Sequence, residues 1–261
     1  MIDQSNGLPE LLPDERLDQV NEKISLIQKK NGLTFGTDAY LLAAYARSVP
    51  RGRAVDLGSG TGIVSLLLLA KNKVASAVAV EIQESFAELI AKNAEINGLS
   101  QRLRPLFADV RTLKPSDVGG EVDLVISNPP YMSVDCGKRN EHDEKFIARH
   151  EVHGGIHDFC AAAGRILRFG GRFVCVFRPD RLSQLMSGLK SATLEPKRMT
   201  FVHADAESEP STVLVEAVKG GSPSLRVSPP LLLYQPRRNA DNARVLTEAA
   251  QKIYDTCLFP R

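Results

Sequence analysis

The chain has 261 residues, 43% hydrophobic and 25% charged, which is enough to bury one large core. A formal net charge of only +2 excludes a protein that is strongly basic over its whole surface, and the absence of an 18-residue apolar run argues against a membrane span. The four cysteines show no metal-ligand or C-x-x-C spacing, and the N-terminus lacks the regions of a signal peptide. These features predict a cytoplasmic protein with reduced thiols and no bound metal.

The first element with a clear pattern is a short strand at 54–57 that runs into a glycine-rich turn. Gly58, Gly60 and Gly62 permit a tight turn, and a leucine-rich helix is predicted from Ile63 to Lys71. Main-chain N–H groups would therefore face a ligand at the start of that helix. The spacing is G-x-G-x-G, unlike the G-x-G-x-x-G of dinucleotide sites, and the preceding Asp56 suits an ammonium group better than a pyrophosphate. A purely structural turn is the alternative.

Acidic residues follow the next two predicted strands. A strand at 74–80 ends in Glu81, which is placed to accept hydrogen bonds from ribose hydroxyls. A helix is predicted at 86–97, and a strand at 103–107 leads to Asp109, which could accept a hydrogen bond from an adenine amino group. The order of these residues at successive strand ends predicts one binding edge.

The most informative stretch is Asn128-Pro129-Pro130-Tyr131, directly after a β-branched strand at 122–127. Two prolines stop the strand and keep the chain extended at the edge where open α/β sheets bind ligands. If the Asn128 side-chain oxygen and the Pro129 carbonyl each accept one N–H, the lone pair of a planar amino or amide nitrogen is freed for reaction. Tyr131 can stack on the planar group. A proline-terminated strand end with a surface tyrosine is the alternative.

The segment at 133–153 is polar and charged, and we expect it to contact RNA or to cover the target pocket, unless it is a surface insertion. Its histidines and His157 match no common metal site. Downstream, helices are predicted at 156–167 and 181–192, and strands at 173–177, 199–203 and 212–218. The last two strands form an expected antiparallel pair that closes the sheet.

Basic residues gather toward the C-terminus. From Lys219 to Arg261 there are seven Lys or Arg and three Asp or Glu, whereas residues 1–30 have four and six. An anionic RNA could lie across such a patch, although a solvated face is the alternative. A terminal helix is predicted at 240–257, where apolar residues have helical spacing. We expect it to pack on the core.

These residues resemble the class I S-adenosylmethionine-dependent methyltransferases that carry the NPPY tetrad. The stretches Phe35-Gly36-Thr37-Asp38, Ala148-Arg149-His150-Glu151 and Glu195-Pro196-Lys197-Arg198 further resemble the bacterial tRNA1(Val) adenine-37 N6-methyltransferase family. The similarity spans roughly residues 12–234, and the tail beyond it departs from the family. The resemblance implies a Rossmann-like α/β fold with a seven-stranded, mostly parallel sheet, one antiparallel strand and helices on both faces. It implies an N-terminal extension at 1–53 over the donor site, a core at 54–221 and a C-terminal extension at 222–261.

The resemblance also implies the roles of individual residues. Asn128, Pro129, Pro130 and Tyr131 would be catalytic. The donor, S-adenosyl-L-methionine, would be bound by Phe35, Thr37, Asp38, Asp56, Gly58, Ser59, Gly60, Gly62, Glu81, Ile82, Asp109 and Asn128.

The implied reaction is methyl transfer to N6 of adenine 37 in the anticodon loop of tRNA by a monomer without a metal. That base is unpaired, so presenting it costs less than flipping a base out of a duplex. Methylation of another RNA or of a protein glutamine, whose amide presents the same two N–H groups, stays an alternative, as does a non-catalytic binding module. Only 53 residues precede Ala54, which leaves little room for the helical domain of the glutamine enzymes.

Overall fold

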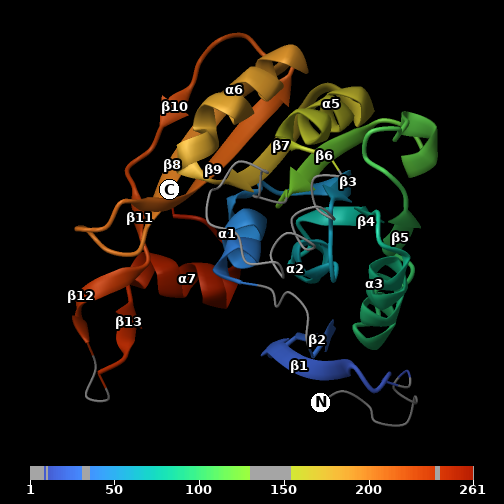
Figure 1. Cartoon of the computed structure of the whole chain (residues 1–261), viewed down its shortest axis with the longest axis horizontal. Helices are drawn as coiled ribbons and strands as arrows, with labels where there is room; N and C mark the ends of the chain where they lie inside the picture. The colour runs from blue at the N-terminus through green and yellow to red at the C-terminus, as the bar shows by residue number, and fades with distance from the viewer. Residues whose placement is uncertain (1–8, 10, 31–35, 130–153, 239–241, 261) are drawn as a thin grey trace, which may run out of the picture.

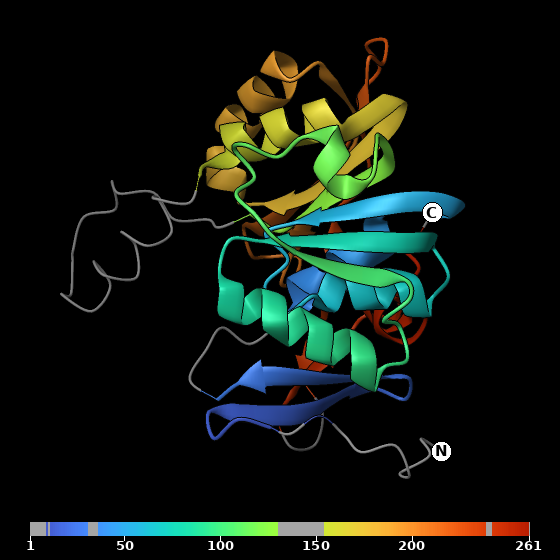
Figure 2. The same ribbon diagram turned by 90° about the vertical axis from the view of Figure 1, so that its right-hand side faces the viewer.

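A computed structural model describes residues 9, 11–30, 36–129, 154–238 and 242–260. A β-sheet crosses the molecule with helices on both faces (Figures 1 and 2). Its main strands run in the order β8-β9-β7-β6-β3-β4-β5, and β9 is antiparallel to both of its neighbours. The bounds are β3 (Val49–Leu57), β4 (Val74–Glu81), β5 (Leu103–Phe107), β6 (Val122–Ser127), β7 (Leu167–Phe177), β8 (Leu194–His203) and β9 (Pro210–Lys219).

This sheet confirms the predicted fold class. The seven main strands include one antiparallel strand, and two short parallel strands, β10 (Arg226–Val227) and β11 (Leu231–Leu232), extend the sheet beyond β8. The predicted strands at 103–107 and 122–127 have the observed bounds.

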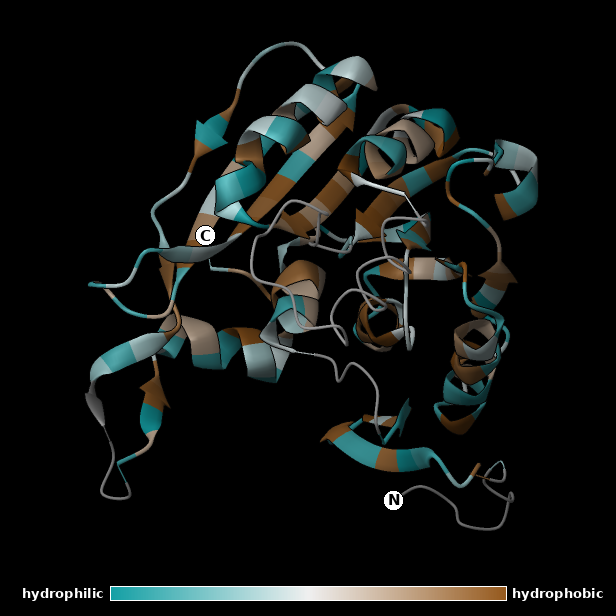
Figure 3. Ribbon diagram, in the orientation of Figure 1, coloured by the Kyte–Doolittle hydropathy of each residue, from teal (hydrophilic) through white to brown (hydrophobic). Residues whose placement is uncertain are grey.

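The helices cover the sheet because its strands are apolar on both faces. Leu124 and Ile126 of β6 face one layer of helices, whereas Val125 faces the other, as the period of two requires. The first layer consists of α1 (Thr37–Tyr45), α2 (Ile63–Ala70) and α3 (Glu84–Ile96). The second layer consists of α5 (Ile156–Ile166), α6 (Leu182–Ser191) and the 3₁₀ turn η1 (Pro115–Val118). A further 3₁₀ turn, η2 (Pro179–Arg181), leads into α6. In Figure 3 the main strands are predominantly hydrophobic in colour.

An N-terminal hairpin, which the sequence patterns did not predict, forms a further layer beyond α3 (Figure 2). It consists of β1 (Glu15–Asn21) and β2 (Ile24–Lys29). Asn93 of α3 accepts from the Ile27 N–H at 2.6 Å and donates to the Ile27 carbonyl at 3.0 Å. One turn later, Asn97 makes the same pair of bonds with Ser25 at 3.0 and 2.7 Å. Two side-chain amides thus satisfy the strand edge as a third strand would.

The C-terminal segment differs from the prediction. The terminal helix α7 covers only Glu248–Thr256, whereas Arg244–Leu246 forms strand β13, paired with β12 (Tyr234–Arg238). Thr247 separates the two elements because its hydroxyl accepts the Ala250 N–H and caps the helix. The predicted helix at 240–257 was therefore too long at its start. The expectation that it packs on the core is confirmed, since Ala250 and Ile253 are fully buried.

Candidate functional site

The carboxyl ends of β3 and β6 lie side by side at the point where the chain order of the sheet reverses. From β3 the chain continues to β4 and β5 on one side, and later to β6 and β7 on the other. Leu57 pairs with Ser127 in the register of these two strands, so Gly58 and Asn128 follow at the same edge. The Ser127 hydroxyl donates to the Leu57 carbonyl at 2.9 Å and fixes this alignment. In open α/β sheets such a switch point is where ligands bind.

The glycine turn begins at this point. Gly58, Gly60 and Gly62 have φ of 68°, 55° and 80°, in the region that favours glycine. A Cβ at Gly58 would lie 3.1 Å from Phe159, and one at Gly62 would lie 3.2 Å from Ile90, whereas a Cβ at Gly60 would meet nothing within 4 Å. The outer glycines therefore allow close packing of α5 and α3. Gly60 leaves open space beside its main chain, as a ligand needs.

Asp56 is almost fully buried beneath this turn, with 1% of its surface exposed. Burial raises the pKa of its carboxyl to about 7, although the Ser65 hydroxyl donates to it at 3.0 Å. No cation pairs with it among the residues that the structure describes. A cationic group that reached it would stabilise the ionised carboxylate.

Glu81 holds the turn together from the neighbouring strand. Its carboxylate accepts the Gly60 N–H at 3.0 Å through Oε2, and the N–H groups of Ile82 and Gln83 at 3.0 and 3.1 Å through Oε1. A carboxylate has about four acceptor positions, so Oε2 retains one. Ser59, also buried, donates its main-chain N–H to the Val80 carbonyl at 3.1 Å. Ile82, half-buried, lies directly after Glu81.

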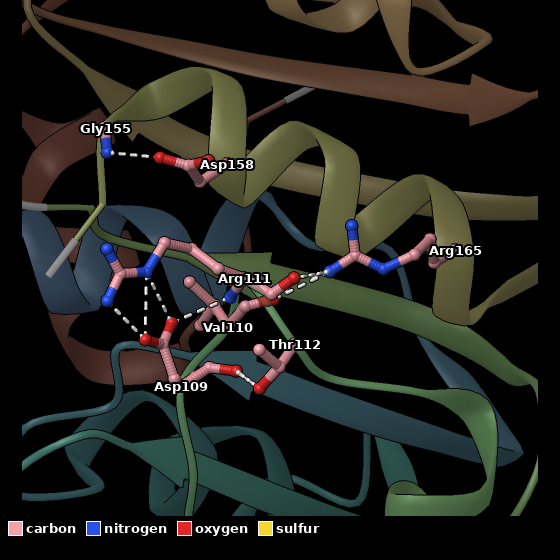
Figure 4. Close-up of polar contacts among 7 residues, drawn as sticks. All are labelled: Asp109, Val110, Arg111, Thr112, Gly155, Asp158 and Arg165. Atoms are coloured by element: carbon pink, nitrogen blue, oxygen red, sulfur yellow. Dashed lines mark hydrogen bonds and ion pairs between the residues drawn. The ribbon is translucent and has the colours of Figure 1, made fainter.

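Asp109 lies beyond β5 at the same edge, and its carboxylate forms an ion pair with Arg111 (Figure 4). The Arg111 Nε lies 3.0 and 2.9 Å from the two carboxylate oxygens, and Nη2 lies 2.5 Å from Oδ2. The main-chain N–H of Arg111 donates to Oδ1 at 2.8 Å. Figure 4 also shows Arg165 of α5 bonded to the carbonyls of Val110 and Arg111, which fixes this loop against the helix. An incoming N–H would therefore compete with Arg111 for Asp109.

Asn128 and Pro129 complete the described part of the edge. Asn128 is half-buried and Pro129 is buried. The proline has no N–H, so the strand ends here, and the register of β3 and β6 puts the start of the tetrad beside the start of the glycine turn.

The start of α1 reaches this edge from the N-terminal side. Asp38 in its first turn accepts from the Thr212 hydroxyl at 3.5 Å, and Thr37 accepts from the Tyr254 hydroxyl of α7 at 2.9 Å. The C-terminal helix thereby supports the start of α1, where the resemblance implies that Thr37 and Asp38 bind the donor. The sequence offered no local signal for this contact, because Thr37 and Tyr254 are 217 residues apart.

Several predicted residues lie outside the described ranges: Phe35, Pro130, Tyr131, the segment at 133–153 with three of the histidines, and Cys136. Within the described ranges no group of three or more His, Cys, Asp or Glu is arranged for a metal ion. Among the same residues, the helices are too short or too polar to cross a membrane. Cys160, Cys175 and Cys257 are buried free thiols.

Comparison with known families gives one match over most of the core. The model of the methyltransferase small domain matches residues 30–191. This range includes the glycine turn, the acidic strand ends and the tetrad.

Two curated relatives show what this chain is similar to. The chain is 28% identical over 196 residues to a tRNA1(Val) (adenine(37)-N6)-methyltransferase of a Flavobacteriaceae bacterium, covering 75% of this chain and 81% of that protein. It is 29% identical over 178 residues to the protein of that name from Pedobacter heparinus, covering 68% and 74%. The resemblance inferred from the motifs is confirmed.

Solved structures support the fold. A predicted O-methyltransferase from Agrobacterium tumefaciens superposes with a TM-score of 0.68 at 22% identity, over 85% of this chain and 98% of that one. The tRNA m1G37 methyltransferase of M. jannaschii gives a TM-score of 0.54 at 14% identity, over 80% and 58%. Both share the architecture of the sheet and its helices with this chain.

Proposed function

This chain belongs to the methyltransferase small domain family, and on that premise we propose that it transfers a methyl group from S-adenosyl-L-methionine to N6 of adenine 37 in tRNA1(Val). The observation that carries the proposal is the register of β3 and β6, in which Leu57 pairs with Ser127. This register sets the glycine turn and the start of the tetrad side by side at the switch point. A donor on the turn and an amino group at Asn128 would therefore be neighbours.

The residues below and beside the turn fit this donor. The buried Asp56 has no cationic partner in the described chain and suits the ammonium of a methionine moiety. Glu81 keeps one acceptor position for a ribose hydroxyl, and the open space at Gly60 allows close approach. Asp109 would accept the adenine amino group, while Ile82 would border the ring. Thr37 and Asp38, in the first turn of α1, would contact the donor from the N-terminal side.

The acceptor nitrogen would be held by Asn128 and Pro129. The Asn128 side-chain oxygen and the Pro129 carbonyl each accept one N–H, which draws the nitrogen toward tetrahedral geometry and frees its lone pair. When bound, S-adenosylmethionine supplies a methyl group that its sulfonium charge has already activated. The task of this chain is then to bind, orient and exclude water, and well-oriented reactants can gain about 7–11 kcal/mol from proximity. Tyr131 would stack on the target base.

The choice of tRNA draws support from the names of the relatives and from the charge of the chain. Lys219 to Arg261 holds seven basic and three acidic residues, a patch suited to an RNA backbone. An unpaired base in an anticodon loop needs no separate domain to extract it.

The experiment is nucleoside mass spectrometry of unmodified tRNA1(Val), other tRNA and ribosomal RNA incubated with the protein and S-adenosylmethionine. We expect N6-methyladenosine in tRNA1(Val) alone. Asn128→Ala should lower the rate by about 10²–10³-fold, as the loss of one hydrogen-bonding group that acts in a transition state does elsewhere. Binding of S-adenosylhomocysteine, measured by calorimetry, should stay near that of the parent protein.

Other outcomes point elsewhere. Methylation of ribosomal RNA alone would keep the chemistry and replace the substrate. Donor binding without methylation of any RNA would favour a protein glutamine as acceptor. If Asn128→Ala methylates at the parent rate, Asn128 does not hold the target nitrogen.

A further inference from the structure

A pocket lies on the side of the sheet away from the glycine turn. Its volume is about 230 Å³, and its walls come from the middle of β3 and β4, from the first residues of β5 and β6, and from the loops before β5 and β6. The polar side chains that line it belong to Arg53, Ser76, Ser100, Gln101, Arg102 and Arg104. Its lining contains no acidic residue. Three positive charges thus share one small depression.

Main-chain carbonyls hold these arginines in place. Arg53 donates to the carbonyls of Gly119 and Glu121, each at 2.8 Å. Arg102 donates to the carbonyls of Val74 and Ala75, each at 2.9 Å. These bonds order the guanidinium groups without neutralising them.

Among the described residues, a single hydrogen bond holds the Arg104 side chain. It donates to the Asp117 carbonyl at 2.7 Å, and a guanidinium has five N–H groups, so several remain for another acceptor. Around Arg53 the chain turns closely through Gly119 and Gly120, whose φ values are 79° and 104°. A Cβ at Gly119 would lie 3.1 Å from the Arg53 Nη1, so this turn is shaped to the guanidinium.

In the described part of the chain, none of the three arginines forms an ion pair with Asp or Glu. The Asp123 carboxylate accepts the Arg53 main-chain N–H at 2.9 Å and forms its ion pair with Arg168 at 2.6 Å, although its charge also attracts the Arg53 guanidinium. Neighbouring like charges repel, and an anion in the pocket would remove that repulsion.

We propose that this pocket binds the phosphate group of a small anion: inorganic phosphate, pyrophosphate or the terminal phosphate of a mononucleotide. The planar guanidinium fork matches phosphate oxygens in pairs, and the serine hydroxyls and the Gln101 amide add neutral donors. A cavity of about 230 Å³ has room for one or two phosphate groups. This site is independent of the proposed methyl transfer.

The test is isothermal titration calorimetry of the full chain with phosphate, pyrophosphate and AMP, in a buffer free of phosphate and sulfate. Saturating S-adenosylhomocysteine is included in a parallel series, so that binding of AMP at the proposed donor site is recognised by its loss. We expect saturable binding of pyrophosphate that S-adenosylhomocysteine leaves unchanged. Arg104→Gln should weaken it at least tenfold, a change of about 1.4 kcal/mol.

Arg16→Gln is the matched control. It removes the same charge from an exposed arginine of β1 that pairs with Asp18 at 2.9 Å, far from the pocket in the fold, and it should change pyrophosphate affinity less than twofold. Arg104→Lys keeps the positive charge but lacks the planar guanidinium, and it should lower pyrophosphate affinity by less than Arg104→Gln does. Thermal unfolding of each variant checks that it folds.

Three results would overturn the proposal. The first is that the parent protein binds none of the three anions saturably. The second is that Arg104→Gln and Arg16→Gln lose equal pyrophosphate affinity. The third is that S-adenosylhomocysteine displaces pyrophosphate completely. If Arg104→Gln weakens binding of an oligoribonucleotide and leaves pyrophosphate binding intact, the arginines form an RNA contact in place of a small-anion site.

Discussion

The two edges of the central sheet present different ionisable groups to the main chain, although the same strands connect them. Asp56, Glu81 and Asp109 lie at the carboxyl edge, whereas Arg53 and Arg104 lie on the amino-terminal side of β3 and β5. At one edge acids accept N–H groups, as Glu81 does from Gly60, Ile82 and Gln83. At the other edge, bases donate to carbonyls, as Lys73 does to those of Ala43, Ala44 and Ala46 at the end of α1.

The direction of the helices accounts for this difference. In a parallel α/β sheet, helices begin at the carboxyl edge, where their first N–H groups lack partners, and end at the amino edge, where their last carbonyls do. Acids therefore stabilise the first edge and bases the second. The carboxyl edge can bind a donor that carries an ammonium group and hydroxyls, and the amino edge an anion. Each variant below breaks one part of this comparison.

The largest effect is expected from Asn93→Ala. The buried Asn93 amide bonds the N–H and carbonyl of Ile27 and, at 3.0 Å, the carbonyl of Thr61 in the glycine turn. Its removal leaves these buried groups without that partner and should lower the free energy of unfolding by about 3 kcal/mol. Urea denaturation measures this. Asn97→Ala, at a half-buried position, should cost less; equal losses would mean that burial of the amide is not decisive.

At the amino edge, we expect Lys73→Met to lower the free energy of unfolding by about 2 kcal/mol. The buried ammonium donates to the carbonyls of Ala43, Ala44 and Ala46 at the end of α1, at 2.7, 3.0 and 2.9 Å. Burial lowers its pKa to about 8, so it remains charged at neutral pH. The variant keeps the apolar stem and removes the donors. Lys71→Met is the control, because Lys71 makes an exposed hydrogen bond to the Asp255 carbonyl, and its free energy of unfolding should change little. If Lys73→Met is as stable as the parent protein, bases do not stabilise this edge.

The pH dependence of donor binding tests Asp56. Its pKa of about 7 lies above the ordinary 3.8, so the carboxyl is mostly protonated below pH 7 and cannot attract an ammonium. Donor affinity should therefore rise as pH increases from 5 toward 7, by up to about tenfold per unit, while an α-amino group stays protonated. Calorimetry with S-adenosylhomocysteine measures this. Asp56→Asn should bind weakly with a flat profile, and a flat profile in the parent protein would exclude Asp56 as the partner of the ammonium.

The smallest effect is expected from Arg111→Gln. Arg111 competes for the Asp109 carboxylate in the free protein, and exposed ion pairs are worth about 0.2–1 kcal/mol. The variant should bind S-adenosylhomocysteine up to about fivefold more tightly. Arg16→Gln, which breaks a pair of similar exposure, should have no effect. Weaker binding by Arg111→Gln would show that Arg111 positions Asp109 and does not compete with the ligand.

Local patterns predicted the parts of this protein that have local causes. The strands at 103–107 and 122–127 are short apolar runs between turn residues, and the glycine turn follows from backbone geometry that few other residues allow. The hairpin was not predicted, because what fastens β2 is a pair of amides from α3. The terminal helix was predicted too long, because the helical spacing of apolar residues includes Leu246. In the structure Leu246 belongs to β13 and pairs with Tyr234 of β12.

The candidate site divides in the same way. The sequence by itself determined which side chains stand at the ends of strands, namely Asp56, Glu81, Asp109 and Asn128, because a strand end is a local property of the chain. Only the tertiary structure decided that Leu57 lies beside Ser127, that Arg111 forms an ion pair with Asp109, and that Arg53 of β3 lines one pocket together with Arg102 and Arg104 at the start of β5. Pairing between distant strands is a property of the whole packed sheet, and no single stretch of sequence records it.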